Sequence, residues 1–217
     1  GRVVFGSRII DLPLAKRQQL KIMLPVEQAL SMCFSTAAAL DRAEREGSQE
    51  AATLLRILTP VLKFRSTRDA RKVCGDALEM RGGIGYVEEF ATPRLLRDAH
   101  LGSIWEGTGN IIALDAITRA IGRHHAEGAL AADLHARLQE APSLPATYRD
   151  HLRKLTDRAV AFAQNVAAKS DNEADARRAT SMLYHTARAV VMAWEGEQIL
   201  AKRGDARRFL LSKLVVD

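Results

Sequence analysis

The sequence predicts an all-α protein, a four-helix bundle with additional C-terminal helices. Apolar residues recur at steps of three and four along each long segment, the spacing that lines one face of a helix. No segment shows the strict apolar–polar alternation of a half-buried strand. Clusters of glycine and proline separate the periodic segments. With 217 residues, 47% of them apolar, the chain is long enough to bury a core.

The first predicted helix covers residues 13–46. Asp11 is expected to cap it, Pro13 suits an early helical position, and Pro25 inside the pattern predicts a kink. An apolar stripe runs along one side, and we expect this stripe to be the buried face. Its residues are Met23, Val26, Leu30, Cys33, Ala37 and Leu40.

The second predicted helix runs from Ser48, which can cap it, to about Met80. Pro60 is expected to bend this helix, and the glycines from Gly82 onward end it. The stretch RGGIGYVEEFATPRLL then predicts a glycine-rich turn and a short helix with Pro93 near its start.

Further helices are predicted toward the C-terminus. One begins after the stretch GTGN, where Thr108 or Asn110 can act as its cap. Residues 139–148 break the helical pattern with two prolines, and helices follow around residues 152–166, over residues 174–202 and near the end of the chain. We expect these helices to pack antiparallel as a bundle, with further helices appended to it.

Composition limits the possible functions. The net charge of +6 and a pI near 9.6 permit a polyanionic partner without requiring one. Two cysteines, Cys33 and Cys74, indicate no disulfide framework, and no histidine has metal-ligand spacing, so no metal is expected. No apolar run approaches the ~20 residues of a membrane-spanning helix, and no signal-peptide pattern opens the chain. We therefore expect a cytoplasmic protein that has no membrane partner.

One carboxylate lies in unusual surroundings. Glu106, in the stretch GSIWEGTGNII, has large apolar neighbours and directly precedes a predicted helix. Burial would raise its pKa and a helix N-terminus would favour its anion, so it can serve as a general base near neutral pH. A glutamate at a helix start without chemistry explains the pattern equally well. The triplet Trp-Glu-Gly recurs at Trp194, but there it lies inside a helical pattern, and Glu195 is expected to point to solvent.

The glycines of MRGGIGY also have two interpretations. Three glycines in four positions let backbone N–H groups approach a phosphate, or they form the turn that ends a helix. No predicted strand precedes them, which argues against a dinucleotide-binding fingerprint.

Three motifs in this order resemble the C-terminal helical domain of the flavin-dependent acyl-CoA dehydrogenases: RVVFG at 2–6, RGGIGYVEEFATPRLLRDA at 81–99 and IWEGTGNI at 104–111. The resemblance covers about residues 1–125 and implies that they form the bundle, with residues 126–217 as a helical extension packed on it. It implies an FAD-dependent oxidoreductase that converts an acyl-CoA thioester to a 2-enoyl-CoA and passes electrons to an acceptor such as an electron-transfer flavoprotein. It also implies a homo-oligomer, a dimer or a tetramer. In that family the flavin and the substrate lie between this domain and preceding ones, so this chain alone is expected to be inactive.

The resemblance also implies roles for single residues. Glu106 corresponds to the base that removes the α-proton of the acyl-CoA, after which the β-hydrogen leaves as a hydride to the flavin. Trp105 and Gly107 correspond to residues beside the substrate. Six positions correspond to FAD contacts, the first four of them to the FAD of a neighbouring subunit: Arg2, Phe5, Gly82, Gly83, Thr108 and Asn110.

The sequence departs from the family at Glu79, where a glutamine that bonds FAD is usual. A carboxylate there would repel a pyrophosphate unless it is protonated or turned away. The residues of these motifs are most similar to those of the AidB-like, alkylation-response branch of the family. Members of that branch are linked to DNA binding and have weak dehydrogenase activity. A DNA-binding, alkylation-protective flavoprotein is therefore the alternative hypothesis.

Basic residues could meet the phosphates of DNA in that alternative. An ordinary solvated helix face explains them as well, and they could equally attract the phosphates of coenzyme A. They are Lys63, Arg65, Arg68, Arg71, Lys72 and Arg81 on the second helix, and the pairs Arg177-Arg178, Lys202-Arg203 and Arg207-Arg208.

Overall fold

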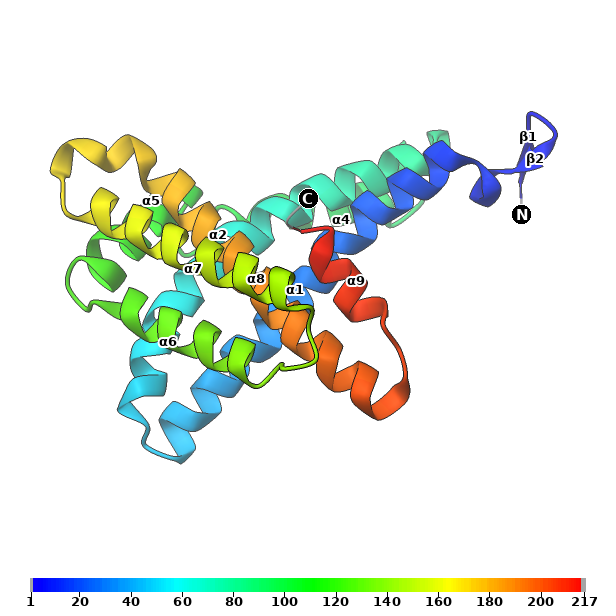
Figure 1. The fold of residues 1–217 in the computed structure, drawn as a ribbon. Coiled ribbons are helices and arrows are strands. Elements are labelled where there is room, and N and C mark those ends of the chain that lie inside the picture. The colour runs from blue at the N-terminus through cyan, green and yellow to red at the C-terminus, as the bar shows by residue number, and fades with distance from the viewer. Residues whose placement is uncertain (1, 216–217) are drawn as a thin grey trace. The chain divides into compact units, whose positions relative to one another are not determined.

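The computed structural model describes residues 2–215, and of residues 170–172 only the backbone (Figure 1). It confirms the all-α class. The long helices are α1 (Pro13–Arg45), α2 (Gln49–Met80), α7 (Ala146–Ala167) and α8 (Ala176–Arg203). Shorter helices are α3 (Gly83–Tyr86), α4 (Thr92–Gly102), α5 (Gly109–Leu114), α6 (Ala126–Gln139) and α9 (Arg207–Lys213). A π-helical stretch, η2 (Asp115–Ile121), continues α5, and η1 (Ile9–Asp11) and η3 (Ser170–Asp175) are 3-10 turns.

The N-terminus contains a small hairpin that the sequence did not predict. Strands β1 (Val3–Val4) and β2 (Ser7–Arg8) pair antiparallel. Phe5 and Gly6 form the turn with φ angles of 52° and 77°, and a two-residue hairpin turn of this hand requires positive φ at both positions. Strands of two residues are too short to show apolar–polar alternation, so the sequence pattern does not indicate this hairpin.

The helices form two compact units, and each unit takes one half of α1 and one half of α2. The first unit runs up to Glu27 and includes Ser66–Trp105. The second comprises Gln28–Arg65 and the chain from Glu106 onward. The predicted division at residue 125 falls inside the second unit, between η2 and α6, and as a domain boundary it remains a prediction.

The core of the second unit is built around α8, which packs against α6, α7 and α9 (Figure 1). Buried side chains from both sides of residue 125 join one hydrophobic cluster, among them Phe64, Ile117, Leu130, Leu152 and Tyr184. The helices after residue 125 therefore share their core with the segment before it.

Helix α1 buries a different face from the predicted one. Val26 and Leu30 of the predicted stripe are 53% and 46% exposed. In their place Ser31 Oγ donates a hydrogen bond of 2.7 Å to Glu195 of α8, and Arg137 of α6 donates one of 3.1 Å to Ser35 Oγ. The helical period was correct, but polar partners on α6 and α8 select which side faces inward. The buried residues of α1 are Gln28, Ser31, Met32, Ser35 and Ala39.

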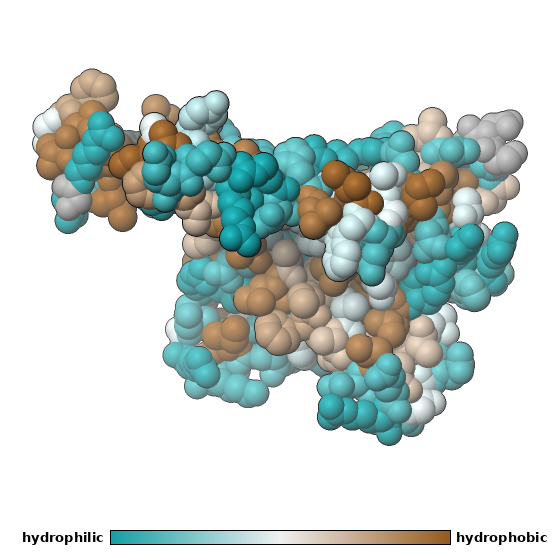
Figure 2. Space-filling view, turned by 180° about the vertical axis from the view of Figure 1, so that it is seen from behind, coloured by the Kyte–Doolittle hydropathy of each residue, from teal (hydrophilic) through white to brown (hydrophobic). Residues whose placement is uncertain are grey.

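The outward side of α1 adds to the hydrophobic surface of the chain. Hydrophobic side chains reach the surface among hydrophilic ones on the face shown in Figure 2. By length and composition, α1 is also the one helix of the described residues that meets the requirements for crossing a membrane. The core helix of a soluble protein meets the same requirements, so this observation assigns no membrane.

The predicted helix boundaries are mostly confirmed. Ser48 caps α2, because its Oγ accepts a hydrogen bond of 3.2 Å from the backbone N–H of Ala51. Asp11 is not the cap of α1; it ends the η1 turn, and its carboxylate pairs with Arg8 at 2.7 Å. Pro25 and Pro60 lie inside α1 and α2, which continue through them.

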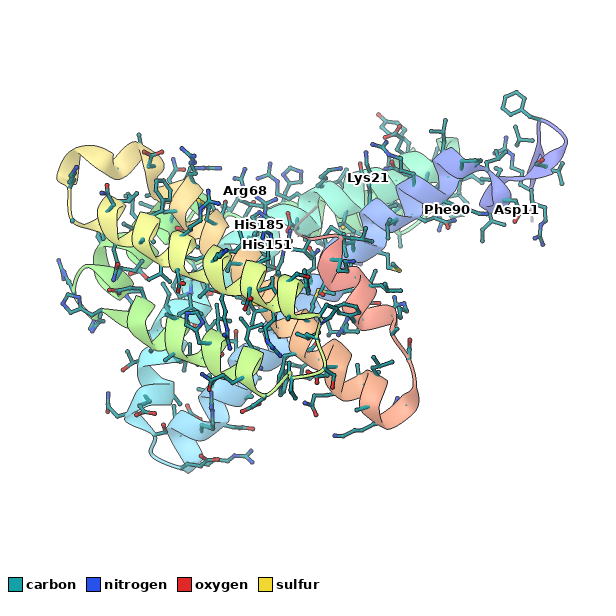
Figure 3. The ribbon with its side chains drawn as sticks, viewed as in Figure 1. Asp11, Lys21, Arg68, Phe90, His151 and His185 are labelled. Carbon is teal, nitrogen blue, oxygen red and sulfur yellow. The ribbon has the colours of Figure 1, made fainter. Side chains whose placement is uncertain are left out.

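His185 of α8, labelled in Figure 3, should make the stability of the chain depend on pH. Burial, with help from the charges of Arg188 and Arg65, lowers the pKa of His185 from 6.5 to about 3. As the pH falls from 6.5 to about 3, His185 therefore becomes protonated in the unfolded chain while it stays neutral in the native chain. The free energy of unfolding should be fully retained above this window and fall within it, by up to about 1.4 kcal/mol per pH unit.

Urea unfolding at pH 7 and at pH 4.5 would measure this dependence. We expect His185→Gln to lose part of the acid sensitivity. The control is His151→Gln, because His151 is exposed on α7 (Figure 3) and should leave the dependence unchanged. Equal pH dependence in both variants would contradict the prediction.

Candidate active site

Glu106 lies in a sharp turn between α4 and α5. Its φ is 54°, in the left-handed region that few residues other than glycine adopt, and Gly107 follows with a φ of 110°. A side chain at Gly107 would be strained and would place its Cβ 3.1 Å from Ile112 Cδ1. Strained backbone of this kind costs on the order of 1 kcal/mol or more and gathers at functional sites. The turn thus requires the glycine and holds the glutamate in an unfavourable conformation.

Helix α2 braces this turn from the same unit. Lys63 Nζ donates a hydrogen bond of 3.3 Å to the carbonyl oxygen of Gly107. Arg56 donates two hydrogen bonds, of 2.9 and 3.0 Å, to the carboxylate of Asp115 in η2. The segment that carries Glu106 is therefore tied to α2 both at the turn and one helical stretch further on.

The residues that follow the turn expose hydrogen-bonding groups. Thr108 is the N-cap of α5, as predicted, but its side chain makes no capping hydrogen bond. Asn110 is exposed, and its Oδ1 accepts a hydrogen bond from Arg177 Nη1 of α8. A cavity of about 350 Å³ lies beside Asn110, lined by α5, by the end of η3 and by the start of α8.

The apolar enclosure expected around Glu106 is absent among the described residues of this chain. Glu106 itself is exposed, and Trp105 is 56% exposed. Ile104 and Ile111 are exposed as well. The candidate base and its nearest apolar neighbours in the sequence are therefore exposed.

The glycine-rich turn belongs to the first unit. Gly82, with a φ of 63°, separates α2 from α3, and a Cβ on Gly82 or Gly83 would meet nothing within 4 Å. Gly85 is a packing glycine, because a Cβ there would lie 2.2 Å from the carbonyl oxygen of Leu78. The turn interpretation is thus correct, and the open space at Gly82 and Gly83 leaves their backbone accessible. Arg2, Phe5 and Glu79 of the same unit are also exposed, Phe5 to 94%.

The second Trp-Glu-Gly triplet is structural. Glu195 does not point to solvent as predicted; it is partly buried and accepts hydrogen bonds from Ser31 Oγ and, at 3.0 Å, from Arg208 Nε. Trp194 donates a hydrogen bond of 3.0 Å to Glu140, and the guanidinium of Arg137 lies 4.8 Å from the centre of its ring. These contacts join α1, α6, α8 and α9, and none of them involves the candidate base.

Several basic residues considered for DNA contact have partners within the chain. Arg71 donates a hydrogen bond of 3.3 Å to Ser103 Oγ, and Lys72 pairs with Asp76 at 2.5 Å. Arg178 lies over the ring of Phe162. Lys202 and Arg203 at the end of α8 are exposed. Across the described part of the chain, no group of three or more His, Cys, Asp or Glu side chains could hold a metal ion.

Comparison with known proteins defines the class. A family model for the C-terminal domain of acyl-CoA dehydrogenases matches residues 1–122, and the chain belongs to this family. Among its relatives, AidB of Escherichia coli (strain K12) is 39% identical over 116 residues, which are 54% of this chain and 21% of AidB. Acyl-CoA dehydrogenase family member 11 of Caenorhabditis elegans is 34% identical over 125 residues, 57% of this chain and 20% of that protein. The chain thus spans about a fifth of the length of these relatives.

A solved structure shows the same fold over nearly the whole chain. Caenorhabditis elegans ACDH-11, in complex with C11-CoA, matches with a TM-score of 0.84 and 24% identity, over 99% of this chain and 37% of that one. The match includes the helices beyond the family segment, so the helical region after residue 122 has a structural counterpart there.

Proposed function

We propose that this chain is the C-terminal part of an FAD-dependent acyl-CoA dehydrogenase in which Glu106 removes the α-proton of an acyl-CoA thioester. The observation that carries the proposal is the turn at Glu106. A carboxylate is held there in a left-handed backbone, fixed to α2 through Lys63 and Gly107, within the segment that matches the family. A positioned carboxylate of this kind suits proton abstraction.

The chain's own residues have distinct parts in this chemistry. A carboxylate oxygen of Glu106 accepts the proton, and Gly107, with its positive φ, forms the turn that presents this carboxylate. Trp105 presents an exposed ring that can border the thioester. Because Glu106 is exposed in this chain, water must be excluded by the part of the protein that the longer relatives have in addition, and the chain alone should be inactive.

The exposed donors of the site fit FAD, which supplies the hydride acceptor when bound. Thr108 has a hydroxyl without a capping role, and Asn110 has an exposed amide, so both can hold the cofactor. Gly82 and Gly83 offer accessible backbone to the FAD of a neighbouring subunit, together with Arg2 and Phe5, which implies a homo-oligomer. Glu79 is the residue that does not fit, since its carboxylate disfavours a nearby phosphate.

Anaerobic addition of acyl-CoA thioesters to the full-length protein tests this proposal. We expect the protein to purify with FAD and the flavin absorbance to bleach on addition of substrate. An electron-transfer flavoprotein should then restore the colour by accepting the electrons. Failure of any acyl-CoA to bleach a bound flavin would overturn the dehydrogenase proposal.

Replacing Lys63 by methionine should slow flavin reduction roughly 3- to 10-fold, the effect of one modest hydrogen bond on the position of the base. The variant removes the hydrogen bond to the Gly107 carbonyl and keeps the length of the side chain. Its kcat should fall while KM stays nearly constant, because the substrate is still bound. Lys154→Met, at an exposed position on α7, is the matched control. Equal kcat values in the two variants would refute the bracing role of Lys63.

The DNA-binding alternative has weaker support, because several of its candidate residues have partners within the chain. A gel shift of the full-length protein with duplex DNA at increasing salt distinguishes the two. Binding that weakens steeply with salt, in a protein whose flavin no acyl-CoA bleaches, would favour the alternative. We expect bleaching and no DNA complex at moderate salt.

A further inference from the structure

Arg177 brings the C-terminal helices to the candidate cofactor site. It lies in the first turn of α8, outside residues 1–122 that match the family model. Its Nη1 nevertheless donates a hydrogen bond to Asn110 Oδ1, and its guanidinium lies 5.7 Å from the centre of the Phe64 ring. Arg177 and Asn110 both line the cavity beside α5.

This contact decides which way the amide of Asn110 points. A guanidinium has donors only, so it can bond the amide oxygen and never the amide nitrogen. An exposed asparagine otherwise turns its oxygen and its nitrogen outward with similar ease. Phe64 is fully buried, and its ring gives the guanidinium a fixed platform. With the oxygen held by Arg177, the two N–H groups of Asn110 remain to donate to a ligand.

We propose that Arg177 is a positioning residue for FAD, which holds the amide of Asn110 so that its N–H groups face an acceptor atom of the cofactor. The inference rests on the proposed function, in which Asn110 contacts FAD. It assigns a cofactor-binding role to the helices that follow the family segment. Arg177 acts through Asn110, because its Nη1 already donates to that side chain.

The test is the FAD dissociation constant of the full-length protein, measured by flavin fluorescence as FAD is added to apo-protein. Arg177→Ala should weaken FAD binding roughly 3- to 10-fold, the effect of one modest hydrogen bond, and Asn110→Ala by a similar factor. Because Arg177 acts through Asn110, the double variant should bind FAD no more weakly than Asn110→Ala alone.

Two further variants separate positioning from a general effect of charge or folding. Asn110→Asp keeps an oxygen for Arg177 but has no N–H group, so it should lose FAD affinity even though the contact persists. Arg178→Ala removes the same charge from the next residue, which lies over Phe162, and should leave FAD affinity unchanged.

The outcomes are distinguishable. Additive losses in the double variant, an equal loss in Arg178→Ala, or unchanged affinity in Arg177→Ala would overturn the positioning role and leave the proposed function standing. If the unaltered full-length protein bound no FAD at all, the proposed function would fail and this inference with it.

Discussion

Replacing Glu106 by glutamine in the full-length protein should slow acyl-CoA-dependent flavin reduction by about 10²- to 10⁴-fold, the usual contribution of a general base. Glutamine keeps the size and the shape of the side chain, but its amide cannot take up the α-proton. FAD affinity should hardly change, because Glu106 is exposed and makes no hydrogen bond to Thr108 or Asn110 among the described contacts. Stopped-flow absorbance of the flavin measures the rate.

The matched control is Glu44→Gln in the last turn of α1, where the glutamate is exposed. This variant should reduce its flavin at the unaltered rate. If Glu106→Gln bleached as fast as Glu44→Gln, another residue would have to be the base, and the strained turn would need a different explanation.

Replacing Gly196 by alanine should lower the free energy of unfolding by about 3 kcal/mol, at the upper end of the usual cost of overpacking. A Cβ at Gly196 would lie 2.5 Å from the backbone nitrogen of Phe209 and 2.7 Å from its Cα, so α9 would have to move. That movement would disturb the edge-to-face contact of Phe209 with Tyr148, whose rings are 5.8 Å apart, and the hydrogen bond of 3.1 Å between Tyr148 and Ser212. Urea unfolding of the chain measures the loss.

Gly128→Ala gives the opposite expectation with the same chemical change. Gly128 lies in the first turn of α6, where an added Cβ would meet nothing within 4 Å. Alanine there should raise the free energy of unfolding by up to about 1 kcal/mol, because it restricts the unfolded chain. Similar values for the two alanine variants would show that the contact between α8 and α9 does not constrain Gly196.

The positions of the helices could be predicted from the sequence, but the buried face of α1 could not. Periodicity located α1, α2, α8 and α9 to within a few residues and α7 except for its first turns, because it reports a local property of the chain. The buried side of α1 depends on Glu195 and Arg137, which lie more than a hundred residues away in the sequence. A hydrophobic stripe shows that one face of a helix favours burial against another apolar surface. It does not show that the contact is made within the same chain, and here Val26 and Leu30 remain exposed.

The residues of the candidate site could be predicted where they lie together in one continuous sequence motif. The Trp-Glu-Gly-Thr stretch pointed to Glu106, and the structure adds that the φ of Glu106 lies in the left-handed region. The contacts of Lys63 and Arg177 could not be predicted, because nothing in the sequence marks which basic residue meets a carbonyl or an amide far along the chain. The sequence predicts only that both belong to a basic surface, which is a statement about composition.

The shared core of the second unit has a consequence for how such proteins can be recombined in evolution. The match to the family model ends at residue 122, yet Phe64 and Ile117 before that point and Leu152 and Tyr184 after it belong to one cluster. A gene fusion that joined the family segment to an unrelated helical tail would set these side chains against a surface of the wrong shape. The end of the family segment is therefore not a domain boundary at which the following helices could be replaced by unrelated ones. Because the two stretches share one core, the shape of each one constrains the other.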